Sequence, residues 1–148
     1  MAAPTGIIRN AVKEDIPDIL AMIRDLANHL DDLEHVKATE ELLFKNHGYF
    51  YNFGTWTAKP GVYLEDLYVK PECRGKGYGK ALLAYLAKEV KRIDGARLDW
   101  QVAERNKSGM EFYKGIGAKY LSEWRCMRVD GDGLDTLGEM GPKLEFVE

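Results

Sequence analysis

Apolar residues recur along the chain with two spacings, and their alternation predicts the order of helices and strands. Residues 14–30 carry apolar side chains three and four positions apart, the spacing of a helix with one apolar face. Asp15 is placed to cap this helix, and Pro17 is tolerated in its first turn. A short second helix is expected after Thr39, which is a suitable cap.

The clearest helical pattern follows a glycine-rich loop in the middle of the chain. Its apolar positions are Leu82, Leu83, Leu86, Val90 and Ile93. Gly95 is well placed to end this helix. A last helix is expected to begin at Asn106 or Ser108 and to stop at Gly115 or Gly117.

β-prone segments lie between these helices. Residues 6–12 are interpreted as a first strand, and residues 48–56 and 61–69 as two more, with a turn at residues 59–61 between them. Residues 96–102 are interpreted as a further strand. Residues 119–131 are expected to form a closing pair of strands, and the rest of the C-terminal part is weakly patterned. Alternating helices and strands predict one α/β domain over residues 1–148.

Composition narrows the class of protein. The chain has 148 residues, 45% of them hydrophobic and 30% charged, with a net charge of −3. The charge offers no basic footprint for nucleic acid and suits a cationic substrate. Neither a membrane-length apolar run nor a signal peptide is found, and the two cysteines, Cys73 and Cys126, are expected to be reduced in a cytoplasmic protein. The three histidines lack metal-ligand spacing, so no metal is expected.

The glycine-rich loop carries the strongest chemical signal. Residues 72–80 read ECRGKGYGK and stand directly before a helix. Backbone N–H groups at a helix start bind phosphate, and glycines leave room and conformational freedom for that contact. Arg74, Lys76 and Lys80 add charge that suits a diphosphate. The alternative is a structural strand-to-helix turn with solvated basic side chains.

Two common phosphate loops fit this stretch poorly. A nucleoside-triphosphate loop needs Ser or Thr where Ala81 stands, and a glycine where Arg74 stands. The dinucleotide fingerprint started at Gly75 needs a glycine where Lys80 stands, and it belongs near the first strand of a domain. The remaining pattern, R-G-x-G-x-G between a strand and a helix, is the one that the sequence matches.

This stretch resembles the coenzyme A pyrophosphate loop of the GNAT superfamily of N-acetyltransferases. Residues 64–83, LEDLYVKPECRGKGYGKALL, carry the likeness, and residues 106–118, NKSGMEFYKGIGA, resemble a later motif of the same superfamily. Within it, YLEDLYV, RGKGYG and EWRCMRVD look like the spermidine/spermine group, which includes relatives acting on thialysine and other small amines. The resemblance implies a mixed, mostly antiparallel sheet flanked by helices, and acetyl-CoA as the cosubstrate.

The resemblance also implies roles for particular residues. The coenzyme would contact Leu67, Tyr68, Val69, Arg74, Gly75, Lys76, Gly77, Tyr78, Gly79, Lys80, Asn106 and Tyr113. Tyr113 would act as general acid toward the coenzyme A sulfur. Its alternative is a packed aromatic residue, and the alternative for Asn106 is a plain helix cap.

The substrate amine must lose a proton before it attacks a thioester, because an alkyl ammonium has a pKa near ~10. The resemblance favours Glu65 for contacting the cationic substrate and drawing its proton through water. Asp66 and Trp100 are the other expected substrate contacts. Alternation along a strand would let only one of the two neighbouring carboxylates face the cleft. Ordinary ion pairs are the alternative for both.

The sequence departs from the family pattern before Val62. The stretch from the second helix to Val62 has room for one strand where the family fold usually has two. The sheet is therefore expected to be one strand short, or to be completed by a neighbouring subunit in a homodimer. The expected function is transfer of an acetyl group to a small amine. The alternative is a coenzyme A-binding module without transfer activity, and a nucleotide-phosphate binder is disfavoured.

Overall fold

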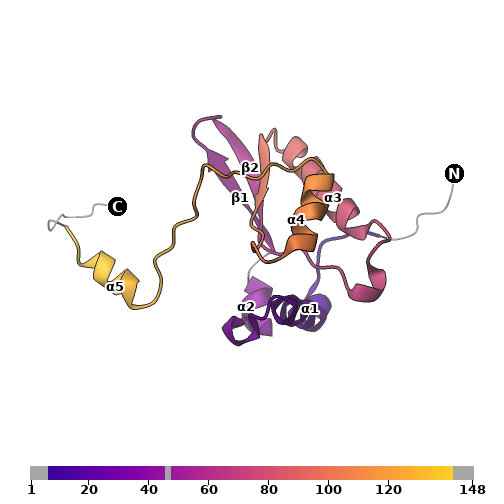
Figure 1. The fold of residues 1–148 in the computed structure, drawn as a ribbon, viewed down its shortest axis with the longest axis horizontal. Helices are drawn as coiled ribbons and strands as arrows, with labels where there is room; N and C mark the ends of the chain where they lie inside the picture. Colours follow the sequence, from indigo (N-terminus) through magenta and orange to yellow (C-terminus); the bar gives the residue numbers. More distant parts are fainter. Residues whose placement is uncertain (1–6, 46–47, 142–148) are drawn as a thin grey trace. The chain divides into compact units, whose positions relative to one another are not determined.

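The computed structural model describes residues 7–45 and 48–141. The chain divides into two compact units, Met1–Gly117 and Ala118–Glu148. The helices and strands of the first unit are, in order, α1 (Ile16–His29), α2 (Glu40–Lys45), β1 (Tyr49–Gly54), β2 (Lys59–Leu64), α3 (Tyr78–Arg92), β3 (Arg97–Trp100) and α4 (Lys107–Gly115). Figure 1 shows this arrangement.

The three strands form one mixed sheet in the order β1-β2-β3. The β1–β2 pair is antiparallel, with Tyr51 opposite Val62, whereas β2 and β3 are parallel, with Leu64 opposite Trp100. α3 is the crossover between the two parallel strands, so β2, α3 and β3 form a βαβ unit. The α/β class and the mixed sheet are confirmed. One strand lies between α2 and β2 among the described residues, as the short stretch before Val62 predicts.

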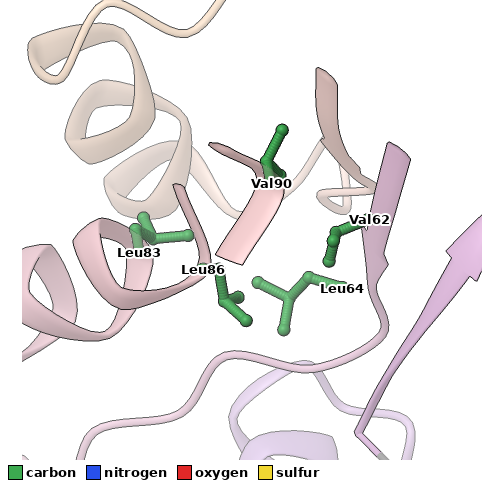
Figure 2. Close-up of a cluster of buried hydrophobic side chains, with 5 residues drawn as sticks. All are labelled: Val62, Leu64, Leu83, Leu86 and Val90. Atoms are coloured by element: carbon green, nitrogen blue, oxygen red, sulfur yellow. The ribbon is translucent and has the colours of Figure 1, made fainter. Parts of the chain in front are cut away.

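The core lies between this sheet and α3. Val62 and Leu64 of β2 point toward Leu83, Leu86 and Val90 of α3, and all five side chains are buried (Figure 2). The three α3 residues recur at the helical spacing that the sequence shows. Burial of each such side chain contributes roughly 1.5–3 kcal/mol, so this contact fixes α3, and the loop before it, relative to β2.

α1 and α2 lie together at one end of the sheet (Figure 1). α1 has the predicted amphipathic face but buries only Ile16 and Leu20. Asp15 is the N-cap residue of α1, as predicted, but its side chain makes no capping hydrogen bond to that helix. Its carboxylate instead accepts from the Val12 N–H at 2.8 Å and from the Arg9 guanidinium at 2.6 Å. A 3₁₀ turn at Lys13–Asp15 extends the helix backward, so Asp15 binds the backbone of a residue that precedes the helical segment.

The turn between β1 and β2 is displaced from its predicted place. Residues 55–58 form the turn, and the expected turn residues 59–61 belong to β2. Ala58 has a φ of 48°, which reverses the chain there, and the Thr57 hydroxyl donates to the Gly54 carbonyl at 3.2 Å. Pro60 is tolerated at the start of the strand, because β3 joins the ladder only from Gly61 onward.

Two strand predictions are wrong. Residues 7–12 adopt no regular structure, and residues 119–130 make no ladder. A strand is stable only where a neighbouring strand accepts its hydrogen bonds. The first segment is instead held by the Arg9–Asp15 contacts. The second contains a turn in which the Trp124 N–H donates to the Leu121 carbonyl at 3.2 Å, but its flanking residues do not pair as strands.

The second unit contains α5 (Asp132–Gly138). Its described residues from 119 to 141 are all exposed. Across the described parts of both units, no helix combines the length and the apolar character needed to cross a membrane.

Candidate active site

The loop before α3 has the backbone shape of an anion cradle. Gly75 and Gly77 have φ values of 73° and 86°, the left-handed region that favours glycine, and Gly77 caps the helix with its backbone. A Cβ at either position would meet no atom within 4 Å, so the conformation, not a shortage of space, calls for glycine. The first N–H groups of a helix have no intrahelical acceptor. Tyr78, Gly79 and Lys80 therefore offer donors at the positive end of the α3 dipole.

Gly79 has a second role in packing. A Cβ on this residue would lie 3.2 Å from the Phe112 Cζ of α4. Glycine thus allows the first turn of α3 to approach α4 closely, which brings the two expected coenzyme-binding motifs together.

Two of the three basic side chains of the loop bind the protein's own backbone. Arg74 Nε donates to the Val69 carbonyl at 2.9 Å, and its guanidinium carbon lies 5.7 Å from the centre of the Tyr68 ring. Lys76 Nζ donates to the Glu72 carbonyl at 2.8 Å. Arg74 thereby fixes the 67–69 segment to the glycine loop. Lys80 lies exposed in the first turn of α3.

The parallel strands β2 and β3 end together, at Leu64 and Trp100. The Glu65 N–H still donates to the Gly48 carbonyl at 3.0 Å, and beyond it the chain leaves the sheet. Leu67 packs against the core, and the Tyr68 hydroxyl lies 3.4 Å from Asp25 Oδ2 of α1. The backbone after Leu64 is not paired with β3, and an elongated ligand could add to the sheet at this point.

Glu65 and Asp66 do not lie on the strand that was expected to carry them. The strand expected to carry them ends at Leu64, so strand alternation does not separate their side chains, and both residues are exposed. Partial removal of water raises the pKa of the Asp66 carboxyl above its usual value. A higher pKa makes a carboxylate a better proton acceptor, so Asp66 is a candidate base alongside Glu65.

Tyr113 lies in a small aromatic cluster at the edge of the core. Its ring centre is 5.0 Å from that of Trp100 and 5.3 Å from that of Phe112. Burial raises the pKa of the Tyr113 phenol, so this group carries its proton at neutral pH and is a weaker acid than a solvated phenol. Trp100, expected to contact substrate, packs against Tyr113 and the core. It supports the position of Tyr113 from the end of β3.

Asn106 caps α4. Its Oδ1 accepts from the Gly109 N–H at 2.9 Å and from the Ser108 hydroxyl at 3.2 Å. The cap interpretation is thus confirmed, and the coenzyme contact stays a prediction. A hollow of about 340 Å³ lies beside this cap; it is lined by His29, Leu30, Asp31, Arg105, Asn106, Lys107 and Ser108.

The order of these features matches a known family. The profile of the acetyltransferase (GNAT) family matches residues 34–118, which include the glycine loop, both parallel strands and α4. The chain belongs to the GNAT family.

Two proteins with similar sequences are named as N-acetyltransferases that act on amines. The thialysine N-epsilon-acetyltransferase of Bos taurus is 30% identical over 164 residues, which cover 88% of this chain and 96% of the bovine enzyme. The L-ornithine N5-acetyltransferase of Arabidopsis thaliana is 35% identical over 92 residues, 62% of this chain but 40% of the plant enzyme. GNAT membership and these named relatives support an N-acetyltransferase enzyme.

Solved structures show the same fold. An integron cassette protein from the mobile metagenome of V. cholerae superposes with a TM-score of 0.72 at 23% identity, covering 89% of this chain and 96% of that one. A ribosomal-protein-alanine N-acetyltransferase of Brucella melitensis superposes with a TM-score of 0.63 at 18% identity, covering 80% and 96%. At these identities the likeness concerns the fold alone.

The bovine enzyme and this GNAT chain differ in length within the aligned region. It runs over 164 positions, although 88% of 148 residues is only about 130. The bovine enzyme therefore contains, within the aligned region, stretches that this chain lacks.

Sequence reasoning missed the residues that hold α1 against the rest of the GNAT site. Asp25 lies near Tyr68, and the Arg105 Nε donates to the Leu30 carbonyl at 2.9 Å across 75 residues of sequence. No periodicity or motif marks such contacts. The sequence shows only that a charged residue, Arg105, directly precedes the Asn106 cap, and this does not identify its partner.

Proposed function

We propose that this GNAT protein transfers an acetyl group from acetyl-CoA directly to a primary amine of a small cationic substrate, such as a polyamine or thialysine. The observation that carries the proposal is the juxtaposition of the glycine loop, the paired ends of β2 and β3, and the aromatic cluster of Tyr113. The net charge of −3 and the exposed carboxylates after β2 suit a cationic substrate.

The coenzyme would extend from the glycine loop to the strand ends. Main-chain N–H groups from Gly75 to Lys80 would hold its diphosphate, and the backbone of residues 67–69 would bind the extended arm. Arg74 supports this arrangement because it links the loop to Val69. These assignments, with Asn106 as a further contact, form part of the proposal.

The chemistry needs one proton acceptor and one proton donor. Glu65, assisted by Asp66, would draw a proton from the ammonium through water, so that the nitrogen lone pair attacks the thioester carbon. As the carbon–sulfur bond breaks, the Tyr113 hydroxyl would protonate the departing thiolate. The raised pKa of the Asp66 carboxyl favours the proton-accepting role. Tyr113 holds the proton that the departing thiolate takes, and its place in the aromatic cluster, not its pKa, supports the donor role.

A second candidate is a coenzyme A-binding module without transfer activity. The short sheet favours it, because the residues described before β2 (7–45 and 48–58) contain one strand. Loss of part of a substrate wall would remove amine binding and leave the glycine loop intact.

The test is turnover of acetyl-CoA with a panel of spermidine, spermine, thialysine, ornithine and lysine. We expect turnover with at least one amine, and Tyr113→Phe to lower kcat by about a hundredfold, the scale of general acid catalysis. Glu65→Gln should also lower kcat, and Tyr85→Phe on the exposed side of α3 is the matched control. Calorimetric binding of acetyl-CoA with no turnover of any amine would select the binding module. Undiminished turnover by both site variants would remove the assigned roles.

We also propose a homodimer. β1 is an edge strand whose residues, YFYNFG, include neither a charge nor a proline that would discourage pairing. Two such antiparallel edges are self-complementary about a two-fold axis. Light scattering should give twice the 16.8 kDa chain mass, and a monomer mass would contradict this proposal.

A further inference from the structure

α1 ends in a compact hydrogen-bonded motif. Asp31, with a φ of 53°, donates its N–H to the Asn28 carbonyl at 3.2 Å, and the Asp32 N–H donates to the Ala27 carbonyl at 2.9 Å. This is a Schellman motif with aspartate at the left-handed position. The motif satisfies the carbonyls of Ala27 and Asn28, whereas the carbonyl of Leu30 accepts a hydrogen bond from a side chain outside the motif.

Arg105 binds this remaining carbonyl from the loop between β3 and α4. Its Nε donates to Leu30 O at 2.9 Å, and its Nη2 lies 3.5 Å from Asp32 Oδ2. His35 Nδ1 contacts the other oxygen of Asp32 at 2.8 Å. A cation at the negative end of a helix dipole is stabilising, and the planar guanidinium can bind two acceptors at once.

Arg105 immediately precedes the Asn106 cap of α4. Tyr113 lies seven residues after Asn106, which is roughly 10 Å along a helix. A displacement of Arg105 therefore acts on the residue that sets the start of the helix carrying Tyr113. The hollow of about 340 Å³ lies at the same junction, with lining residues from the end of α1 and the start of α4.

We propose that Arg105 is a positioning residue of the acetyl-transfer site, an inference that rests on the proposed function. It fixes the end of α1 against the loop that starts α4, and thereby holds Tyr113 in register with the strand ends. α1 depends on such polar contacts because its buried apolar residues, Ile16 and Leu20, lie in its N-terminal half. The exposed Arg105–Asp32 pair alone contributes little, so the bond to Leu30 O is the decisive contact.

The test compares Arg105→Ala and Arg105→Lys with Arg9→Ala. Arg9 is a matched control, because it binds Asp15 through two nitrogens at the other end of α1. We expect Arg105→Ala to lower kcat about tenfold, the scale of one lost charge-assisted hydrogen bond, with KM for acetyl-CoA changed no more than about twofold. Arg105→Lys should have a kcat between those of the wild type and Arg105→Ala. The lysine ammonium can still donate to a carbonyl, but it lacks the planar fork that binds two acceptors at once. Arg9→Ala should lower the thermal midpoint and leave kcat unchanged.

Two kinetic outcomes overturn the inference: kcat unchanged in Arg105→Ala, or kcat reduced equally in Arg9→Ala. Hydrogen exchange provides a readout that does not need activity. Arg105→Ala should speed exchange at the amides of Asp31 and Asp32 and also at Gly109, whose N–H binds the Asn106 cap. Unchanged exchange at Gly109 means that Arg105 does not position α4. If the wild type acetylates no amine, the proposed function fails and this exchange experiment alone decides whether Arg105 links α1 to α4.

Discussion

α1 and α3 are two amphipathic helices of similar length that are anchored by different forces. α3 buries Leu83, Leu86 and Val90 against the sheet. α1 buries two residues near its start, and its C-terminal half is held by polar contacts to Tyr68 and Arg105. Both helices carry the same sequence pattern, so periodicity indicates a helix but does not tell how firmly it is packed.

The two helices also end alike. α3 finishes with Asp94 at a φ of 52°, whose N–H binds the Lys91 carbonyl, and with the Gly95 N–H on the Val90 carbonyl at 2.7 Å. This repeats the motif at the end of α1. Asp94 then pairs with Lys59 of β2, whereas the end of α1 binds Arg105. The core-anchored helix is thus tied to the sheet, and the polar-anchored helix is tied to the loop between β3 and α4.

The largest expected effect is loss of the α3 core contact. Leu86→Ala should lower the free energy of unfolding by about 3 kcal/mol, because it removes buried methyl groups and leaves a cavity. Leu26→Ala on the half-buried face of α1 should lower it by roughly 1 kcal/mol, as less area is buried there. Urea denaturation of both variants measures the difference. Equal losses would mean that α1 is packed as firmly as α3.

The start of α3 gives the next effect. Gly77→Ala should lower the free energy of unfolding by about 1–2 kcal/mol, since alanine is strained at a φ of 86°. Gly115→Ala is the matched control, because this glycine does not have a positive φ and an added Cβ meets no atom within 4 Å. A Gly77→Ala protein as stable as the wild type would show that the loop adopts another conformation.

Acid should weaken the contact between β1 and α3. Arg92 and the Tyr51 hydroxyl hold the pKa of Glu89 at about 2, below its ordinary 4.5. A depressed carboxyl pKa stabilises the fold fully above pH 4.5, and this contribution is lost as the pH falls toward 2. We expect Glu89→Gln to flatten the decrease of the urea midpoint between pH 5 and pH 3. An unchanged slope would mean that the Tyr51–Glu89–Arg92 contact does not form in solution.

The smallest expected effect is a gain in stability at the end of α1. Asp31→Gly should raise the free energy of unfolding by about 0.5 kcal/mol, because glycine adopts the left-handed conformation without strain. Thermal unfolding measures the shift, and Asp94→Gly provides the comparison at the end of α3. A gain at Asp94 only would indicate that Asp31 contributes a compensating contact.

The sequence predicted the helices better than the strands. α1, α3 and α4 were predicted because their apolar spacing and caps are local properties, and the Thr39 hydroxyl accepts from the Leu42 N–H at 3.3 Å as expected for the α2 cap. Residues 7–12 and 119–130 were assigned to strands incorrectly. Their composition suits a strand, but a strand also needs a neighbour, which the local sequence does not encode.

Within the candidate site, the glycine loop was predicted from motif chemistry, and its left-handed glycines agree with that prediction. The packing role of Gly79 and the backbone bond of Arg74 were not predicted, because each depends on a residue brought near by folding. The resemblance favours Glu65 over Asp66, yet partial loss of water around the Asp66 carboxyl raises its pKa, which the sequence does not reveal.

The sequence by itself determined the family, the order of the helices and the place of the glycine-rich loop, since these depend on short motifs and on periodicity. The tertiary structure alone decided where β2 ends, which side chains surround Tyr113, and how Arg105 reaches the end of α1. The physical reason is that these features come from contacts between residues far apart in the chain, whose energies depend on distance and burial in the folded state.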